Sequence, residues 1–172
     1  RKLRTLEGLD VRPTTAVVKE AMFSSIQFEV EGAAVLDLFA GSGQLGIEAL
    51  SRGARSCDFV DKSRQSREVV LENLQTAGLM KQARVSNMEA LPFLQTTAEV
   101  FDIALLDPPY GQELLPAVLP ALARRMSPHG VILCESRWED ALPQEVGDFS
   151  VHKTYRYGKI KLTAYRRKEP RP

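Results

Sequence analysis

The chain has few of the side chains that build disulfide networks and metal sites. Its 172 residues include 2 cysteines and 2 histidines, too few for a disulfide framework or a cysteine–histidine metal centre. Cys57 and Cys134 lie in apolar, strand-like runs and are expected to be small buried hydrophobic residues. No apolar run approaches the roughly 18 residues that a membrane-spanning helix needs. No signal-type segment opens the chain, so we expect a cytoplasmic protein without a metal site or membrane contact.

Repeats, low-complexity stretches and long linkers are also missing from the sequence. A length of 172 residues corresponds to about one domain, at roughly 150 residues per domain. The hydrophobic fraction of 44% and the charged fraction of 26% are those of a globular chain, which excludes a disordered or collagen-like one. We predict a single domain over residues 1–172, with residues 167–172 as a frayed tail. No heptad seam is visible, so a monomer is expected.

Positive charge is unevenly distributed along the chain. Residues 1–19 carry five basic and two acidic side chains, and residues 151–172 carry eight basic and one acidic. Because the whole chain has a net charge of +1, the intervening residues 20–150 carry −9. Two basic ends around an acidic centre indicate a surface that meets an anionic polymer, although ordinary solubilising charge would give the same distribution.

Strand-like and helix-like segments alternate along the chain. Five strands are predicted from β-rich composition, at residues 34–38, 57–61, 83–86, 101–106 and 131–135. Two further strands, at about 150–155 and 159–165, flank Tyr157-Gly158 and are typical of a hairpin. This order predicts an α/β, Rossmann-like fold with a mostly parallel sheet and a C-terminal antiparallel hairpin.

Helices are predicted between these strands. One begins after Ser63, whose side chain can cap it, and ends before Gly78. Another runs from Glu113 to Met126, and an earlier one begins after Thr15, where apolar residues recur every four positions. In a sheet of this kind, ligands bind at the carboxyl ends of the strands. Residues at those ends are therefore the candidate site residues.

The first predicted strand runs into a glycine-rich turn, Asp37-Leu38-Phe39-Ala40-Gly41-Ser42-Gly43-Gln44-Leu45-Gly46. Gly41, Gly43 and Gly46 have the G-x-G-x-x-G spacing, which lets the backbone turn tightly and approach a ligand. Asp61 ends the next strand, where an acid can accept hydrogen bonds from a ribose diol. Together these features predict a nucleoside-bearing cofactor, and both NAD and S-adenosylmethionine fit at this point.

The fourth predicted strand runs straight into Asp107-Pro108-Pro109-Tyr110. Two prolines end a strand, and they also hold a carboxylate, a carbonyl and an aromatic ring at one place. Asp107 and the Pro108 carbonyl could accept the two N–H bonds of an exocyclic amine, and Tyr110 could stack on its base. A hydride-transfer site has no use for this arrangement, so it favours methyl transfer to an amine. An NAD(P)-dependent oxidoreductase and a non-catalytic RNA-binding module stay as remote alternatives.

The motifs together resemble amino-methyltransferases that use S-adenosylmethionine. Among these, the chain resembles the bacterial RsmD family, in Val11-Arg12-Pro13-Thr14, Glu20-Ala21-Met22-Phe23, residues 45–54 and Tyr157-Gly158. That family methylates N2 of a guanine in small-subunit (16S) ribosomal RNA, and the resemblance covers nearly the whole chain. It implies the fold of the S-adenosylmethionine-dependent methyltransferases. Methylation of adenine N6 in DNA or RNA is the alternative, because the same tetrad serves that amine.

The resemblance implies a role for each motif residue. The tetrad Asp107, Pro108, Pro109 and Tyr110 would be catalytic. Asp37 would orient the ammonium group of the cofactor, Asp61 its ribose, and Arg12 and Thr14 would close over the pocket. The other residues expected at the cofactor are Phe39, Ala40, Gly41, Ser42, Gly43, Gly46, Lys62, Asn87, Met88 and Glu89. Where the family often has Asp-Ala this chain has Glu89-Ala90, so Glu89, Asn87 and backbone groups all stay open as the adenine reader.

Ribosomal RNA is the expected partner, either free or in an assembling small-subunit ribonucleoprotein. Four basic residues around the predicted hairpin turn are expected to contact RNA phosphates, namely Lys153, Arg156, Lys159 and Lys161. Lys159 and Lys161 are expected to share one strand face. Residues 1–12 are interpreted as the remnant of a truncated RNA-facing segment. Trp138, after the fifth strand, is expected to pack against the sheet edge rather than stack on a base.

Overall fold

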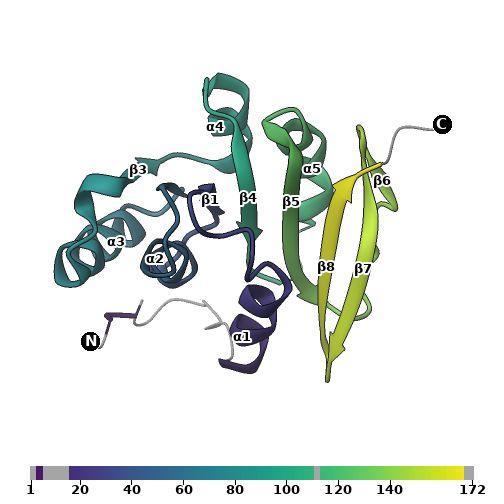
Figure 1. Ribbon diagram of the computed structural model, residues 1–172, viewed down its shortest axis with the longest axis horizontal. Helices are drawn as coiled ribbons and strands as arrows, with labels where there is room; N and C mark the ends of the chain where they lie inside the picture. Colours follow the sequence, from purple (N-terminus) through teal and green to yellow (C-terminus); the bar gives the residue numbers. More distant parts are fainter. Residues whose placement is uncertain (1–2, 6–15, 111–112, 169–172) are drawn as a thin grey trace.

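A mixed β-sheet runs through the centre of the molecule (Figure 1). The computed structural model describes residues 3–5, 16–110 and 113–168. The order of strands across the sheet is β3-β2-β1-β4-β5-β8-β7-β6. The strands are β1 (Ala34–Leu38), β2 (Ser56–Asp61), β3 (Ala83–Asn87), β4 (Phe101–Leu106), β5 (Met126–Arg137), β6 (Glu145–Val146), β7 (Phe149–Tyr157) and β8 (Ile160–Arg167). Neighbours among the first five strands are parallel, and the last three strands are antiparallel to their neighbours.

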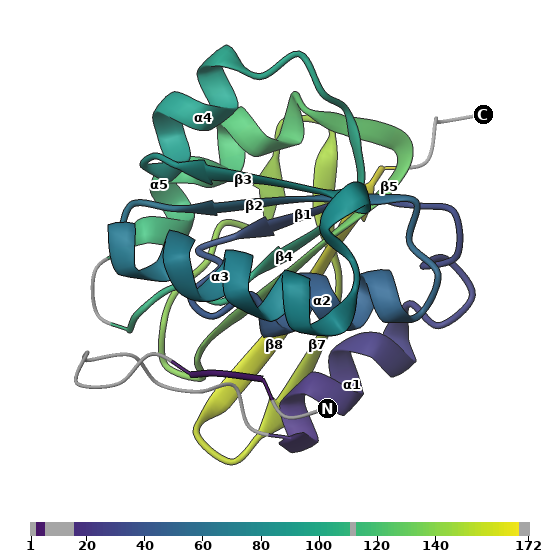
Figure 2. The same cartoon turned by 90° about the vertical axis from the view of Figure 1, so that its left-hand side faces the viewer.

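Helices cover both faces of the sheet (Figure 2). The elements are α1 (Ala16–Ser25), α2 (Gln44–Ser51), α3 (Arg64–Ala77), the short 3₁₀ helix η1 (Met80–Gln82), α4 (Ala90–Thr96) and α5 (Leu114–Ala123). Apolar residues of α1, α2 and α3 form one buried cluster with one face of the sheet, and those of α4 and α5 form a second with the other face. None of the helices in the described part of the chain has the length and hydrophobicity needed to cross a bilayer.

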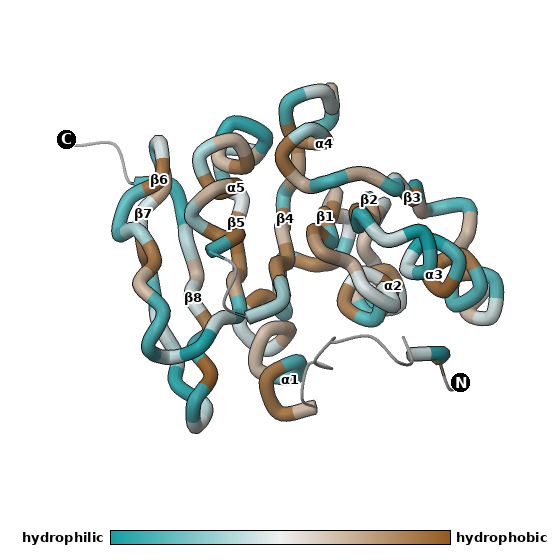
Figure 3. The backbone as a smooth tube through the Cα atoms, turned by 180° about the vertical axis from the view of Figure 1, so that it is seen from behind, coloured by the Kyte–Doolittle hydropathy of each residue, from teal (hydrophilic) through white to brown (hydrophobic). Residues whose placement is uncertain are grey.

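The predicted parallel core and C-terminal hairpin are confirmed. The caps of α3 are also confirmed, since the Ser63 hydroxyl accepts the Ser66 N–H at 3.2 Å and Gly78 is left-handed at the other end. Cys57 and Cys134 are buried as free thiols. The brown, hydrophobic colour of β4 and β5 in Figure 3 contrasts with the teal, hydrophilic turn between β7 and β8.

Some predicted boundaries are wrong, and one strand was not predicted. The helix expected from Glu113 to Met126 ends at Ala123, and Met126 already belongs to β5. Pairing with the sheet ends helix α5, because the Phe101 backbone N–H donates to the Arg125 carbonyl at 2.7 Å. Arg167 is not frayed, since it closes β8 opposite Phe149 and the following Lys168 N–H donates to the Asp148 carbonyl at 2.8 Å. Strand β6 was not predicted, because its 2 residues are too few to show an alternating pattern.

The topology brings several chain segments to one edge of the sheet. Because β2, β1 and β4 are neighbours and parallel, their carboxyl ends lie side by side. Strand β8 begins with Ile160 opposite Arg137, the last residue of β5. The turn of the β7–β8 hairpin therefore lies at this same carboxyl edge, at the bottom of Figure 1.

Candidate active site

A cavity of about 340 Å³ opens at the carboxyl ends of the parallel strands. That volume is within the range of small-molecule sites, roughly 300–1,000 Å³. Nine of the residues expected at the site line it: Phe39, Gly41, Asp61, Lys62, Met88, Glu89, Asp107, Pro108 and Pro109. Its other walls are Val60, Ser63, Ala90, Leu91, Leu114, Ala117 and Val118. The cavity thus has largely apolar walls, and its charged lining residues are three carboxylates and one lysine.

The glycine-rich turn after β1 has the strained backbone that functional turns often show. Phe39 lines the cavity with a φ of 68°, which is rare for a residue with a side chain. Gly43 caps α2 with a φ of 82°, and a side chain there would also press on Val70 and Phe59. Only a glycine fits this position without strain.

Asp61 ties the glycine turn to the end of β2. One of its carboxylate oxygens, Oδ2, accepts the Gly41 N–H, and the other, Oδ1, accepts the Ser63 N–H, each at 2.9 Å. Each carboxylate oxygen has two lone pairs. The side chain can therefore accept further hydrogen bonds from a diol in the cavity while it keeps both amides in place.

Asp37 is buried near the end of β1. It is 1% exposed and does not line the cavity, and its Oδ2 accepts the Gly46 N–H at 2.9 Å. Burial raises the pKa of Asp37 well above its ordinary value; the Gly46 N–H opposes that rise, and the charges of Asp107 and Asp61 add to it. The Asp37 side chain thus closes the first turn of α2, and its expected role at the ammonium group of the cofactor stays a prediction.

Four more of the expected cofactor residues lie outside the cavity lining: Ala40, Ser42, Gly43 and Gly46. Gly46 faces the sheet, where a Cβ atom would lie 2.4 Å from Phe59 Cε2 and 2.7 Å from Cys57 Sγ. The third glycine of the motif therefore permits close packing of α2 on β2.

Asn87 does not line the cavity, but it forms hydrogen bonds to the backbone of residues that do. Its Nδ2 donates to the Asp61 carbonyl at 3.2 Å and to the Lys62 carbonyl at 2.9 Å. The next residue, Met88, donates its N–H to the Asp61 carbonyl at 3.1 Å and lines the cavity together with Glu89. Among the open adenine readers, Glu89 is thus the side chain at the cavity.

Two supports of the glycine turn were missed by sequence reasoning. The Ser66 hydroxyl donates to the Gly41 carbonyl, and Asn73 Nδ2 donates to the Ser42 carbonyl at 2.9 Å. Both side chains come from buried positions of α3. Buried polar residues on an otherwise apolar helix face were the signal that could have indicated them, since such groups need hydrogen-bond partners.

A second cavity, of about 390 Å³, adjoins the first. Pro108, Pro109 and Leu114 line both cavities, whereas Asp107 lines only the first and Tyr110 only the second. The second is also lined by Glu113, Leu115, Pro116, Glu135, Ser136, Asp140, Ala141 and Leu142. The Arg137 guanidinium lies 5.1 Å from the centre of the Tyr110 ring. The proline pair therefore forms a partition between two chambers.

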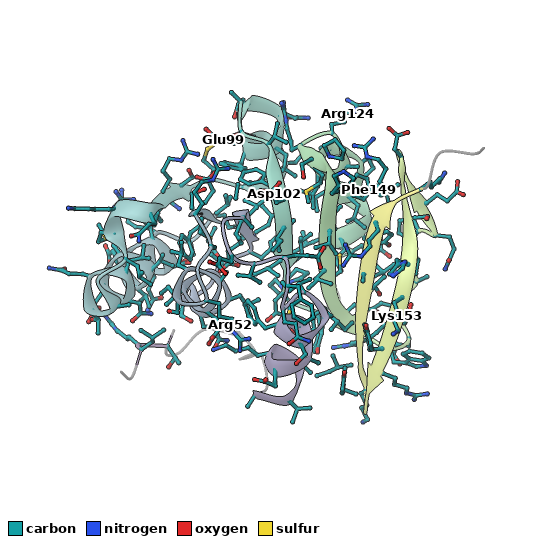
Figure 4. All side chains as sticks on the ribbon, in the orientation of Figure 1. Arg52, Glu99, Asp102, Arg124, Phe149 and Lys153 are labelled. Atoms are coloured by element: carbon teal, nitrogen blue, oxygen red, sulfur yellow. The ribbon has the colours of Figure 1, made fainter. Side chains whose placement is uncertain are left out.

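The expected RNA-contacting residues gather near the hairpin turn. Lys153 and Arg156 lie on β7 and Lys161 on β8, whereas Lys159 lies in the turn. Lys159 and Lys161 therefore do not share a strand face, because the turn takes up the residue before Ile160. Lys161 Nζ donates to the Asp140 carbonyl. In Figure 4 Lys153 lies in the lower half of the hairpin, toward the carboxyl edge, and Phe149 lies near the opposite end.

Two expected cofactor residues, Arg12 and Thr14, lie outside the described residues. Across residues 3–5, 16–110 and 113–168, no group of three or more His, Cys, Asp or Glu side chains could hold a metal ion.

Comparison with known proteins gives the family. The model of the family described as "Conserved hypothetical protein 95" matches residues 1–166. The chain belongs to this family. A Bacillus subtilis (strain 168) relative named "Putative rRNA methyltransferase YlbH" is 38% identical over an alignment of 173 positions, which covers 98% of this chain and 94% of the relative. "Ribosomal RNA small subunit methyltransferase D" of Escherichia coli (strain K12) is 33% identical over an alignment of 171 positions, which covers 97% of this chain and 85% of the relative.

Solved structures agree with this membership. The one described as "Putative methyltransferase yhhF from Escherichia coli" is 34% identical with a TM-score of 0.86, over 97% of this chain and 92% of that chain. SMU.776, described as "a putative methyltransferase complexed with SAH", has a TM-score of 0.75 over 92% of this chain and 51% of that chain. Its identity of 14% shows a shared fold alone. The chain is thus a member of an RsmD-like methyltransferase family with the fold of those enzymes.

Proposed function

We propose that the chain transfers a methyl group from S-adenosylmethionine to the exocyclic N2 amine of a guanine in small-subunit ribosomal RNA. The observation that carries this proposal is the pair of adjoining chambers divided by Pro108 and Pro109, with Asp107 on one side and Tyr110 on the other. A methyl donor and a nucleobase need two such adjoining sites. The names of the two curated relatives support ribosomal RNA as the substrate, which implies action in the cytoplasm.

The first cavity suits S-adenosylmethionine better than NAD. The cofactor would carry a positive sulfonium and ammonium, whereas NAD carries a negative diphosphate. Asp61, Glu89 and Asp107 line the cavity against one cation, Lys62, so a diphosphate would meet mainly repulsive charge. Asp61 keeps lone pairs for the ribose hydroxyls, and Leu91 and Val118 belong to an apolar wall for the adenine. SAH in the similarly folded SMU.776 supports the same choice.

S-adenosylmethionine, when bound, supplies an electrophilic methyl group on a sulfonium that is already a good leaving group. The chain's task is therefore to position the amine, whose lone pair is conjugated with the guanine ring. Asp107 and the Pro108 carbonyl would accept its two N–H bonds and direct the lone pair out of the ring plane. Asp107 would also stabilise the positive charge that develops on nitrogen, and it or water would accept the proton.

Tyr110 would hold the base in the second chamber. Its ring lies beside the proline partition and under the Arg137 guanidinium, which restricts how it can turn. An aromatic ring held in this way can stack on a flipped base without much loss of side-chain freedom. The target guanine would leave its own stack to reach this chamber, a step that is least costly in a loop.

The roles can be tested with Asp107→Asn, which keeps the shape and removes the charge. We expect the variant to bind SAH nearly as well as the parent, while turnover at saturating cofactor falls by roughly 100-fold or more. Asp148→Asn is a matched control, because Asp148 pairs with Arg167 next to Phe149 at the opposite end of the hairpin. Loss of SAH binding with unchanged turnover at saturation would show that Asp107 serves the cofactor and not the base.

A further inference from the structure

Trp138 lies where it can meet RNA. It follows β5 directly and is 39% exposed, and its backbone N–H donates to the Lys159 carbonyl of the hairpin turn at 2.7 Å. Two cations face its ring, with Arg156 Cζ at 4.6 Å and Lys161 Nζ at 5.9 Å from the ring centre. We call Trp138, Arg156 and Lys161 the Trp138 cluster. The ring thus has these two cations beside it, and the residue is partly open to solvent.

Backbone hydrogen bonds hold the members of this cluster in place. Arg156 and Lys161 are opposite each other in the β7–β8 register. Arg156 Nε donates to the Gly158 carbonyl at 3.1 Å, and Lys161 Nζ donates to the Asp140 carbonyl. A freely moving lysine or arginine side chain loses conformational entropy when it binds a ligand. Arg156 and Lys161 are already restrained by their hydrogen bonds, so they would lose less entropy on binding.

The cluster adjoins the chamber proposed for the target base. The guanidinium of Arg137, the residue before Trp138, lies against Tyr110 of that chamber, and the backbone N–H of Arg137 donates to Asp140 Oδ2 at 3.1 Å. Asp140 lines the chamber and accepts Lys161 as well. One short network thus joins the chamber to the cluster.

We propose that the Trp138 cluster binds the nucleotide next to the target guanine. When the guanine leaves its stack, the base beside it loses a stacking partner, and the exposed indole would replace that partner. Arg156 and Lys161 would bind the phosphate of the same nucleotide. This inference rests on the proposed function. It adds a site that stacks on a base whatever the identity of that base, as aromatic platforms in single-strand-binding proteins do.

The single tryptophan of the chain makes a direct test possible. Indole fluorescence would be followed while the full chain, saturated with SAH, is titrated with a short single-stranded RNA that contains one guanine. Two matched RNAs carry an abasic nucleotide on the 5′ or the 3′ side of the guanine, so that the phosphate stays and the base is lost. We expect quenching with the intact RNA and with one abasic RNA, and none with the other.

Variants separate stacking from charge. Trp138→Ala removes the chain's single tryptophan, so RNA binding by the variants and the parent is compared by isothermal titration calorimetry. The variant should bind the intact RNA about 5- to 140-fold more weakly, the range for stacking one base, and should bind the non-quenching abasic RNA as well as the parent does. Phe28→Ala is the control, because Phe28 is 93% exposed and follows α1 away from the carboxyl edge; it should change neither. Equal loss on intact and abasic RNA, or binding without quenching, would overturn the proposal.

The outcome is independent of the methyl-transfer test. Quenching that depends on the flanking base, together with no methylation of guanine, would leave the nucleotide site standing and refute the proposed function. If the Trp138→Ala variant methylates guanine and binds RNA as tightly as the parent, the proposed function stands and the nucleotide site is refuted. Arg156→Ala adds a check on the phosphate contact, since it should reduce the slope of log affinity against log salt by somewhat less than 1.

Discussion

Replacing Gly46 by alanine tests how α2 is packed on β2. The new Cβ would lie 2.4 Å from Phe59 Cε2, and 2.7 Å from both Phe59 Cζ and Cys57 Sγ, whereas carbon atoms in contact are normally about 3.5–4.0 Å apart. Phe59 is 0% and Cys57 2% exposed, so neither side chain has open space to move into. The helix must shift away from the strand, or Phe59 must leave its packed position.

The expected cost follows from two opposing effects. Overpacking of a core costs about 1–3 kcal/mol, and contacts this short against a buried ring fall at the upper end. Alanine gains about 1 kcal/mol over glycine inside a helix, which leaves a net loss of about 2 kcal/mol. In a domain of this size 1 kcal/mol shifts Tm by about 2–4 °C. Gly46→Ala should therefore lower Tm by about 4–8 °C.

Thermal and urea unfolding, followed by circular dichroism, measure this loss. The double variant Gly46→Ala/Phe59→Leu supplies the control, because a smaller side chain at position 59 makes room for the new methyl group. It should lose less stability than the two single variants together, by about 0.5 kcal/mol or more. A Tm equal to that of the parent would refute the packing argument. Unchanged Tm with a large loss of SAH affinity would show that Gly46 serves the cofactor directly.

Three other changes test the site. Asp61→Ala should reduce SAH affinity about 10- to 150-fold by calorimetry, the effect of losing a hydrogen bond to a charged group, and should also lower Tm because the Gly41 and Ser63 N–H groups lose their acceptor; unchanged affinity would exclude Asp61 as the ribose ligand. Burial raises the pKa of the Asp37 carboxyl in the folded state, so the parent loses stability as pH rises from the ordinary pKa of an aspartate through the raised one. Asp37→Asn has no such group. The free energy of unfolding of the variant, measured in urea, should therefore rise relative to that of the parent between about pH 4 and about pH 7, and a difference that does not change with pH would contradict this. Lys159→Ala should lower the salt slope of RNA binding by somewhat less than 1 without changing SAH affinity, and an unaltered slope would show that Lys159 only solubilises the turn.

Local patterns predicted most of the fold and much of the site. The bounds of β1 and β4 agree with the predicted ones, because short β-rich runs bounded by turn residues leave few alternatives. Asp61 and Asp107 lie at the cavity as expected, since the parallel topology alone brings the ends of β2 and β4 to one edge. These features depend only on neighbouring residues and on the order of strands.

Features that depend on side-chain direction or on pairing between distant backbone segments could not be predicted. Whether Asp37 faces the cavity or the first turn of α2 depends on the backbone angles of the glycine turn, and these are not visible in a motif. The pairing of Arg156 with Lys161 beside Trp138 depends on the register of β7 and β8, which only the turn at Gly158 sets. The end of α5 depends on a contact between Phe101 and Arg125, which are far apart in the sequence.

Nucleoside analysis of methylated ribosomal RNA tests the central claim most directly. Small-subunit RNA, free and as the assembling ribonucleoprotein, would be taken from a bacterial strain that lacks this enzyme and incubated with the chain and S-adenosylmethionine. Mass spectrometry of the digested RNA should then show one new N2-methylguanosine, absent with Asp107→Asn. New N6-methyladenosine, or no methylated nucleoside from either form of the RNA, would contradict the account.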